Sequence, residues 1–308
     1  PLQKGGSTCR VKHSRCARGQ YTGRRFFCQD FLEFLQPQTN RLEWIQKSLL
    51  SEGIDSCVFQ IGEQNHIYVK FPLSCYNPLF KIKTILVHYD RIGIGANDNS
   101  AAVYQVIKWA SRLNSQLEPH NIRIIFTDGE EIGFNTENKH FQGALGIAAI
   151  FKRLGITKDD VYTIDSCGRG EVLVISSTGK DSASKELANR FKVLYENTIQ
   201  LAKKTCKESW ITIPVPYGDN AGFMALGIPA VAITLLPKDE ATSYMRELQK
   251  HNKIYQNILN RDEEVANILP ETWRMMHTNQ DSIENLTPES WLVMEKFLDS
   301  LANDKSLA

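Results

Sequence analysis

Long hydrophobic runs are absent from this sequence of 308 residues. No apolar stretch approaches the roughly 20 residues that a membrane-spanning helix requires, and the first residues lack the apolar segment of a signal peptide. Strong charge of one sign is absent too, because 36 Lys and Arg nearly balance 35 Asp and Glu and leave a formal net charge of +1. We therefore expect neither nucleic acid nor a membrane as a partner.

A cysteine framework is also lacking. Seven Cys are an odd number without regular spacing, which favours reduced thiols and a cytoplasmic location over a disulfide-rich secreted protein. The chain does not begin with Met, so a removed signal peptide stays an alternative. The sequence contains no internal repeat, and its length suffices for one large domain with a sizeable core.

The first 26 residues are basic and differ in composition from the rest. They contain Cys9, His13 and Cys16, and Cys28 follows shortly after. These side chains allow a zinc-knuckle interpretation, but the paired Cys-x-x-Cys spacing of such sites is missing. We therefore predict a basic N-terminal arm over residues 1–26 and a single folded domain over residues 27–308.

Apolar segments of strand character alternate with segments of helical periodicity. Strands are expected near 57–61, 66–71, 122–127, 161–165, 171–176 and 230–235, with another ending at His88, and helices near 42–50, 99–113, 141–153 and 184–204. The alternation predicts an α/β fold, with a mixed, largely parallel central sheet sandwiched between helices. Residues 237–272 are charged and helix-prone. They are expected to form a helical insertion, either a plain surface excursion or a lid or oligomer contact beside the site.

Side chains of metal-binding type follow several of these apolar runs. In open α/β sheets, ligands bind beyond the carboxyl ends of the strands, so residues distant in sequence converge there. Taken alone, each candidate has an ordinary explanation, such as a core His, a solvated Glu pair, or an N-cap for the following helix at Asp98 or Asn99. Their combination, in a consistent order, favours a metal site. The candidates are His88, Asp90, Asp98, Glu130, Glu131, Asp165 and His277.

This donor set suits two zinc ions. Zinc binds imidazole nitrogen and carboxylate oxygen, and hydrolytic sites with two metals share a bridging group. Two His, two Asp and one Glu supply one bridging carboxylate, plus one His and one acid for each ion. The other carboxylate of the Glu pair remains free as a general base toward a metal-bound water. Asp90, two residues beyond His88, is expected to contribute to catalysis by accepting the other imidazole N–H, not as a ligand.

The segments that carry these residues resemble the co-catalytic di-zinc aminopeptidases, whose relatives include bacterial leucyl aminopeptidases and glutamate carboxypeptidase II. The resemblance covers roughly residues 40–300. It rests on His88-Tyr89-Asp90, the segments 95–99, 129–133 and 277–281, the strand-end Asp165, and Gly218-Asp219-Asn220, which is similar to a Ser-Asp-His of the family.

The resemblance implies a fold of the zinc-exopeptidase type, two Zn²⁺ per chain and a role for each candidate. Asp98 bridges the two ions. His88 and Asp165 complete the site of one ion, and Glu131 and His277 complete the site of the other. Glu130 is the general base.

The resemblance implies a metallopeptidase that removes N-terminal residues from short peptides by attack of a metal-bridging hydroxide. Three alternatives stay open: a di-zinc hydrolase of acylated amino acids or dipeptides, a mono-zinc enzyme similar to glutaminyl cyclases, and a binding protein without catalysis. The presence of both His88 and His277 argues against the cyclase branch. The intact ligand and base positions argue against a loss of catalysis.

Overall fold

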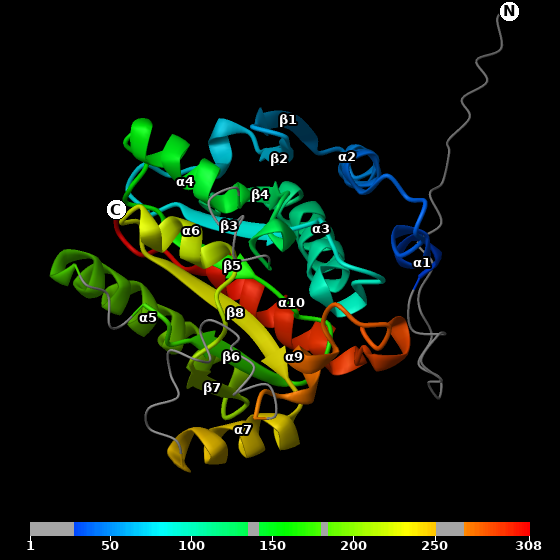
Figure 1. Ribbon diagram of the computed structural model, residues 1–308. Coiled ribbons are helices and arrows are strands. Elements are labelled where there is room, and N and C mark those ends of the chain that lie inside the picture. The colour runs from blue at the N-terminus through cyan, green and yellow to red at the C-terminus, as the bar shows by residue number, and fades with distance from the viewer. Residues whose placement is uncertain (1–27, 135–141, 180–183, 251–267) are drawn as a thin grey trace, which may run out of the picture.

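An eight-stranded sheet forms the centre of the described part of the chain, in the strand order β1-β2-β4-β3-β5-β8-β6-β7 (Figure 1). The structure is a computed structural model that describes residues 28–134, 142–179, 184–250 and 268–308, so the expected arm over 1–26 lies outside the described residues. The strands are β1 (Asp55–Ile61), β2 (Gln64–Lys70), β3 (Lys83–His88), β4 (Ile122–Thr127), β5 (Asp160–Ile164), β6 (Val172–Ser176), β7 (Trp210–Ile213) and β8 (Ala230–Leu236).

Four neighbouring strands in the middle of the sheet are parallel. β4, β3, β5 and β8 pair in parallel, whereas β2 is antiparallel to both β1 and β4, and β6 is antiparallel to β8. Every residue of β3, β5 and β8 is buried, as expected for strands covered on both faces. The prediction of a mixed, largely parallel sheet between helices is therefore confirmed.

Two sets of helices cover the two faces of the sheet (Figure 1). Side chains alternate between faces along a strand: Ile85 and Val87 of β3 lie in the core that includes Trp109 and Leu298, whereas Leu86 packs in a second core. The first face is covered by α2 (Arg41–Ser51), α3 (Ala102–Asn114), α5 (Lys185–Cys206) and α10 (Pro288–Asn303), and the second by α4 (Gly143–Arg153) and α6 (Asp219–Ala225).

Three further helices lie at the edges of this sandwich. They are α1 (Gln29–Phe34), α7 (Lys238–Lys250) and α9 (Glu271–Met275). Tyr244 of α7 packs edge-on against Trp273 of α9, with ring centroids 5.3 Å apart. The predicted insertion over 237–272 therefore contains α7 and the start of α9, while its residues 251–267 lie outside the described part. Its role as a lid or an oligomer contact stays a prediction.

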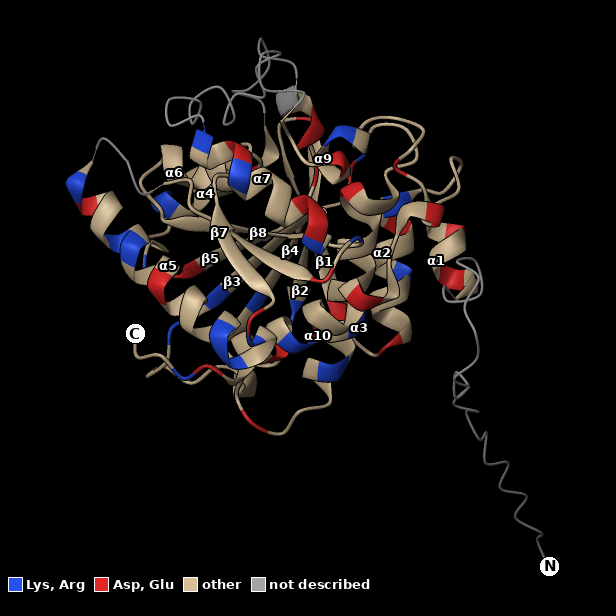
Figure 2. Ribbon diagram, turned by 90° about the horizontal axis from the view of Figure 1, so that it is seen from below, with Lys and Arg blue, Asp and Glu red and all other residues tan. Residues whose placement is uncertain are grey.

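The surface of the described helices carries both charge signs. Figure 2 shows Lys and Arg interspersed with Asp and Glu over the same helices, including α5, whose sequence contains both. Among the described residues, no helix combines the length and the apolar character needed to cross a membrane.

Candidate metal centre

Three adjacent parallel strands bring four candidate ligands to one edge of the sheet. His88 is the last residue of β3, and Asp165 directly follows β5. Glu130 and Glu131 follow β4, which ends at Thr127. Because β4, β3 and β5 are neighbours with the same direction, their carboxyl ends meet at this edge.

A buried, kinked turn over Ala96–Ala101 presents Asp98, whose own φ and ψ are not helical. The turn begins after Gly95, which has a left-handed φ of 58° and where a Cβ would lie 2.5 Å from the carbonyl oxygen of Asp98. Neither Asp98 nor Asn99 caps α3, whose N-cap position is Ala101. Instead, the Asn99 amide donates to the carbonyl oxygen of Ile164 at 2.8 Å. The N-cap interpretation is therefore wrong, because these side chains turn inward toward the strand ends.

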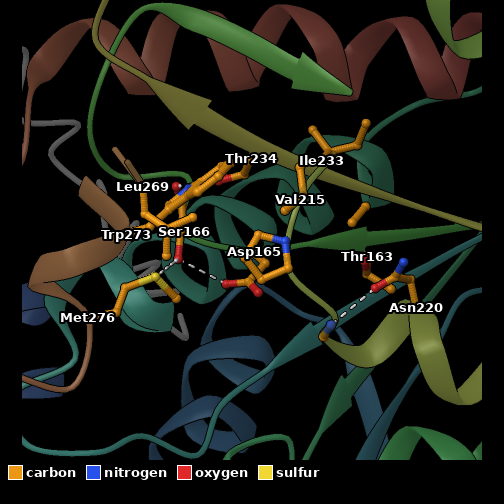
Figure 3. A pocket seen from close by; sticks show the side chains of 13 residues that line it. Thr163, Asp165, Ser166, Val215, Asn220, Ile233, Thr234, Leu269, Trp273 and Met276 are labelled. Carbon is orange, nitrogen blue, oxygen red and sulfur yellow. Dashed lines mark hydrogen bonds between the residues drawn. The ribbon is translucent and has the colours of Figure 1, made fainter. Parts of the chain in front are cut away.

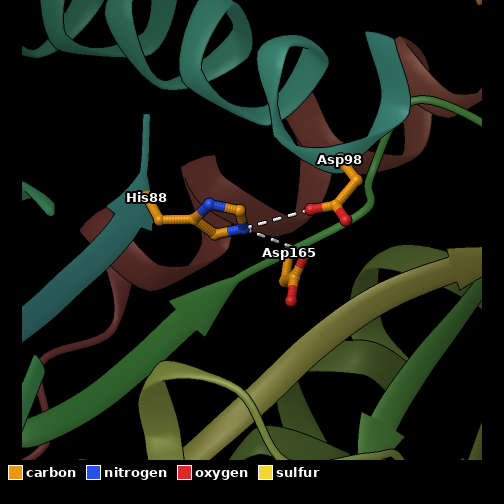
Figure 4. Close-up of side chains that lie close together, drawn as sticks. All are labelled: His88, Asp98 and Asp165. Carbon is orange, nitrogen blue, oxygen red and sulfur yellow. Dashed lines mark ion pairs between the residues drawn. The ribbon is translucent and has the colours of Figure 1, made fainter. Parts of the chain in front are cut away.

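Asp98 lies between two imidazoles. Its Oδ1 is 3.2 Å from His88 Nε2, and its Oδ2 is 3.2 Å from His277 Nε2. Asp165 Oδ1 is 3.6 Å from His88 Nε2, and Glu131 Oε2 is 2.8 Å from His277 Nε2. Figure 4 shows the His88 ring directed at Asp98 and Asp165.

Two triads with Asp98 in common follow from these distances. They are His88, Asp98 and Asp165, and Asp98, Glu131 and His277, and within each triad the ligand atoms lie within 4.8 Å of one another. A third such group consists of His88, Glu130 and Glu131. All six residues thus come together, in an arrangement in which Asp98 faces both sides.

The spacing of these donors fits zinc. In a tetrahedral site with bonds of about 2.1 Å, neighbouring ligand atoms lie about 3.4 Å apart, close to the separations of His88 Nε2 from Asp98 and from Asp165. Both ring nitrogens of His88 are buried, and neither makes a hydrogen bond of good geometry, although oxygens of Asp98 and Asp165 lie 3.2 and 3.6 Å from Nε2. Buried polar atoms without a well-formed hydrogen bond are costly and rare. A metal ion would satisfy Nε2, so the residues present suit the group that the sequence predicts.

The charges within the cluster influence one another strongly. Burial alone would raise the pKa of Asp98, but His277 and His88 hold that pKa well below its ordinary value. Burial lowers the pKa of His277, yet the adjacent Asp98 and Glu131 overcome this effect and raise the pKa to about 10. The imidazoles and the carboxylates of the cluster thus stabilise each other's charged forms.

Glu130 is buried and lies near other carboxylates. Burial raises its pKa well above the ordinary value, and the carboxylates of Asp165 and Asp219 raise it further, although His88 opposes them. A Cβ placed on Gly218 would lie 3.4 Å from Glu130 Oε1 and 3.4 Å from Asp165 Oδ2. Glu130 and Asp165 therefore both lie beside Gly218.

Asp219 is a buried acid to which the sequence analysis assigns no role. Its Oδ2 accepts a hydrogen bond from Thr127 Oγ1 at 2.6 Å, and its Oδ1 is buried without a hydrogen-bond partner. Burial is the main cause that raises the pKa of Asp219 to about 6. In the sequence, only the similarity of Gly218-Asp219-Asn220 to a family segment points to this residue, and that similarity implies no chemical role for Asp219.

Asp90 contacts two of the candidate ligands, His88 and Glu131. Its Oδ1 lies 3.4 Å from His88 Nδ1, the ring nitrogen that faces away from Asp98, and its Oδ2 accepts the backbone N–H of Glu131 at 2.9 Å. None of the three metal-type groups includes Asp90. This placement is compatible with its predicted task of orienting His88.

A small pocket opens beside Asp165 (Figure 3). Its walls include the apolar side chains of Val215, Leu269, Trp273 and Met276. The pocket therefore offers apolar contacts directly beside Asp165.

Solved structures share this fold at low sequence identity. LapA aminopeptidase of Legionella pneumophila is 12% identical, with a TM-score of 0.62 over 89% of this chain and 69% of that one. Glutaminyl cyclase of Porphyromonas gingivalis is 16% identical, with a TM-score of 0.58 over 89% and 94%. BSAP, a zinc aminopeptidase of Bacillus subtilis, is 18% identical, with a TM-score of 0.52 over 79% and 50%.

Sequence comparison identifies the family. No curated protein sequence matches this chain. Residues 82–301, which include every candidate ligand, match the profile described as Peptidase family M28. The expected resemblance to zinc aminopeptidases is thereby confirmed at the level of the family, and the chain belongs to peptidase family M28.

Proposed function

We propose that this protein is an aminopeptidase that holds two zinc ions per chain and removes N-terminal residues from short peptides. The placement of Asp98 carries the proposal, because each of its carboxylate oxygens lies 3.2 Å from a different imidazole. A carboxylate in this position suits a bridge between two ions. His88 and Asp165 would hold one ion, and Glu131 and His277 the other.

The proposed chemistry divides between the metals and the protein. Zinc, when bound, supplies Lewis acidity toward the scissile carbonyl and makes water a better nucleophile at neutral pH. Glu130 takes the proton from the attacking water and passes it to the leaving amine. A raised pKa suits this task, since the carboxyl must both accept and release a proton. Asp90 keeps the His88 ring in its orientation through Nδ1.

The pocket beside Asp165 supports cleavage at the end of a peptide. It adjoins the proposed ligand Asp165, and apolar side chains form part of its walls. A substrate whose first side chain fills this pocket would place its first peptide bond near Glu130, because Gly218 of the pocket wall borders that carboxylate. We therefore expect leucine, valine and similar residues at the N-terminus of good substrates.

A glutaminyl-cyclase-like reaction is the second candidate. The Porphyromonas gingivalis glutaminyl cyclase has the same fold over 94% of its own length. That reaction releases ammonia from an N-terminal glutamine, whereas an aminopeptidase releases a free amino acid. The number of zinc ions separates the two candidates as well, because the expected cyclase-like enzyme binds one zinc ion and the proposed aminopeptidase binds two.

Zinc analysis combined with a substrate panel tests the proposal. Purified protein, supplied with zinc and then dialysed mildly, should retain two zinc ions per chain by elemental analysis. Aminoacyl-anilides with a free amine should be cleaved, leucyl faster than phenylalanyl, and blocking the amine should abolish cleavage. Preference for the blocked series would indicate an acylase. One ion per chain together with ammonia release from a glutaminyl peptide would indicate a cyclase.

A further inference from the structure

Arg41 is a buried cation close to the metal centre but outside it. It is the first residue of α2 and only 8% exposed. Its guanidinium lies over the ring of Phe34, with the central carbon 4.0 Å from the ring centroid. It also lies outside residues 82–301, the part of the chain that matches the family profile. Burying an arginine is costly unless its donors are used, so its contacts are informative.

The guanidinium connects the two segments that carry His88 and Asp98. Arg41 Nε donates to the carbonyl oxygen of Tyr89, the residue directly after His88. Arg41 Nη1 donates to Ser100 Oγ at 2.9 Å. Ser100 lies two residues after Asp98 in the kinked turn over Ala96–Ala101. One planar group thus spans the end of β3 and the turn. The fixed fork of a guanidinium holds two acceptors at a set spacing, which a flexible ammonium does not.

A second arginine strengthens the same connection. Arg91 donates to the carbonyl oxygen of Ile94 at 2.8 Å. The same guanidinium donates to the carbonyl oxygens of Leu35 at 3.0 Å and Gln36 at 2.9 Å, which lie between α1 and α2. The residues that precede Arg41 are therefore anchored to the loop between the two ligands. This anchoring fixes the position from which Arg41 enters the interior.

We propose that Arg41 is a positioning residue that sets the spacing between His88 and Asp98, the two ligands required to share one zinc ion. The inference rests on the proposed di-zinc function. His88 Nε2 and Asp98 Oδ1 lie 3.2 Å apart, close to the about 3.4 Å of a tetrahedral site. Without the guanidinium, the end of β3 and the turn lose the group that both of them contact. Part of the free energy of zinc binding is then spent on bringing His88 and Asp98 together, which lowers the affinity.

The test compares zinc affinity in two variants that each remove a buried cation. Arg41→Met removes both hydrogen bonds but keeps an apolar chain of similar length. Lys83→Met is the matched control, because Lys83 is fully buried at the opposite end of the same strand β3 and pairs with Asp304 at 3.2 Å. Zinc dissociation constants are measured by competition with a chelator of known affinity, and unfolding temperatures are measured alongside.

Arg41→Met should weaken zinc binding by about 10–100-fold, as the loss of other supporting contacts to metal ligands does. Lys83→Met should lower the unfolding temperature but change zinc affinity by less than about threefold, since it lies far from the ligands. Arg41→Lys, which keeps the charge without the fork, should still bind zinc more weakly than the wild type. If Arg41→Met does not fold, Ser100→Ala removes one acceptor of the same contact and should show the same direction.

Wild-type zinc affinity in Arg41→Met or in Arg41→Lys would overturn the inference, and so would an equal loss of affinity in Lys83→Met. A wild-type protein that holds no zinc would instead contradict the proposed function and the inference together. These outcomes are distinguishable because the measurement follows zinc directly and does not depend on peptide cleavage.

Discussion

The carboxylate of Asp281 accepts the backbone N–H of Asp98 at 3.0 Å. Its other oxygen accepts the N–H of Asn97 at 2.6 Å, and its own carbonyl oxygen accepts the N–H of Ala96 at 3.2 Å. Asp281 ends the segment 277–281, so the segment that contains the proposed ligand His277 also fixes the turn that contains the proposed bridge Asp98. The two sides of the metal centre are therefore coupled through the backbone.

Asp281→Asn should loosen this coupling. An amide keeps the shape but replaces one acceptor by a donor, which cannot pair with an N–H and leaves a buried N–H unsatisfied. We expect zinc to bind about 10-fold more weakly while the protein remains folded. The competition with a chelator measures the affinity. The control is Asp299→Asn on α10, where Asp299 forms a partly exposed ion pair with Arg112 of α3. Unchanged affinity in Asp281→Asn would show that the turn holds Asp98 without this contact.

Asp98→Ala and Asp90→Ala should differ in metal content. The first change removes the carboxylate that faces both imidazoles, so we expect loss or weak retention of both ions. The second removes only the partner of His88 Nδ1, so both ions should remain with affinity reduced by about 10–100-fold. Elemental analysis after mild dialysis gives the count. Complete loss of zinc in both variants would mean that Asp90 is itself a ligand.

The size of the pocket should determine which first residue is accepted. Val215→Ala removes two methyl groups from the wall and should raise kcat/KM for phenylalanyl relative to leucyl substrates, by about 10-fold for a difference of this size. Val193→Ala on α5 removes the same groups from a side chain that is 51% exposed and should leave the ratio unchanged. If the ratio is the same in both variants, the first side chain binds elsewhere.

Much of this arrangement could be predicted from the sequence because its signals are local. β4 occurs at the predicted residues 122–127, and the ligand types at the ends of β3, β4 and β5 converge as the topology of parallel sheets requires. The roles assigned to those residues stay predictions. The sequence analysis does not predict β7 or α10. In addition, α3 begins at Ala102 rather than near residue 99, because the kinked turn before it has no simple periodic signature.

Contacts between distant segments could not be predicted in this way. Nothing in the sequence around Arg41 distinguishes it from a surface arginine at the start of a helix. Its burial results from contacts with Phe34, Tyr89 and Ser100, which come from three other segments. The same holds for Asp219, whose burial beside Thr127 depends on how α6 meets the end of β4. Burial and pairing of single polar residues are set by tertiary structure, which no pattern along the chain encodes.

His120 should make stability depend on pH away from the metal centre. It is 2% exposed, its Nδ1 accepts the N–H of Ile122, and burial lowers its pKa from 6.5 to about 4. As pH falls below about 6.5, the unfolded chain takes up a proton that the folded protein does not. The free energy of unfolding should therefore decrease between about pH 6.5 and pH 4, by up to about 3 kcal/mol from this residue.

The variant His120→Asn isolates this contribution. Asn keeps an acceptor for Ile122 but does not titrate, so its unfolding free energy should change less between pH 7 and pH 4 than that of the wild type. Denaturant titrations at several pH values measure the difference. Equal pH dependence in both proteins would mean that His120 titrates alike in the folded and unfolded states.

Glu130→Gln should separate catalysis from metal binding. Glutamine keeps the size and hydrogen bonding of the side chain but cannot accept the proton of the attacking water, so fold and zinc content should persist. General acid–base catalysis is worth about 10²–10⁴-fold, and kcat should decrease by at least that range with little change in KM. Glu131→Gln is the matched variant, because Glu131 Oε2 lies 2.8 Å from His277 Nε2 and its loss should weaken one zinc site. If Glu130→Gln turns over leucyl-anilide near the wild-type rate while Glu131→Gln keeps both ions, the roles assigned to this pair are wrong.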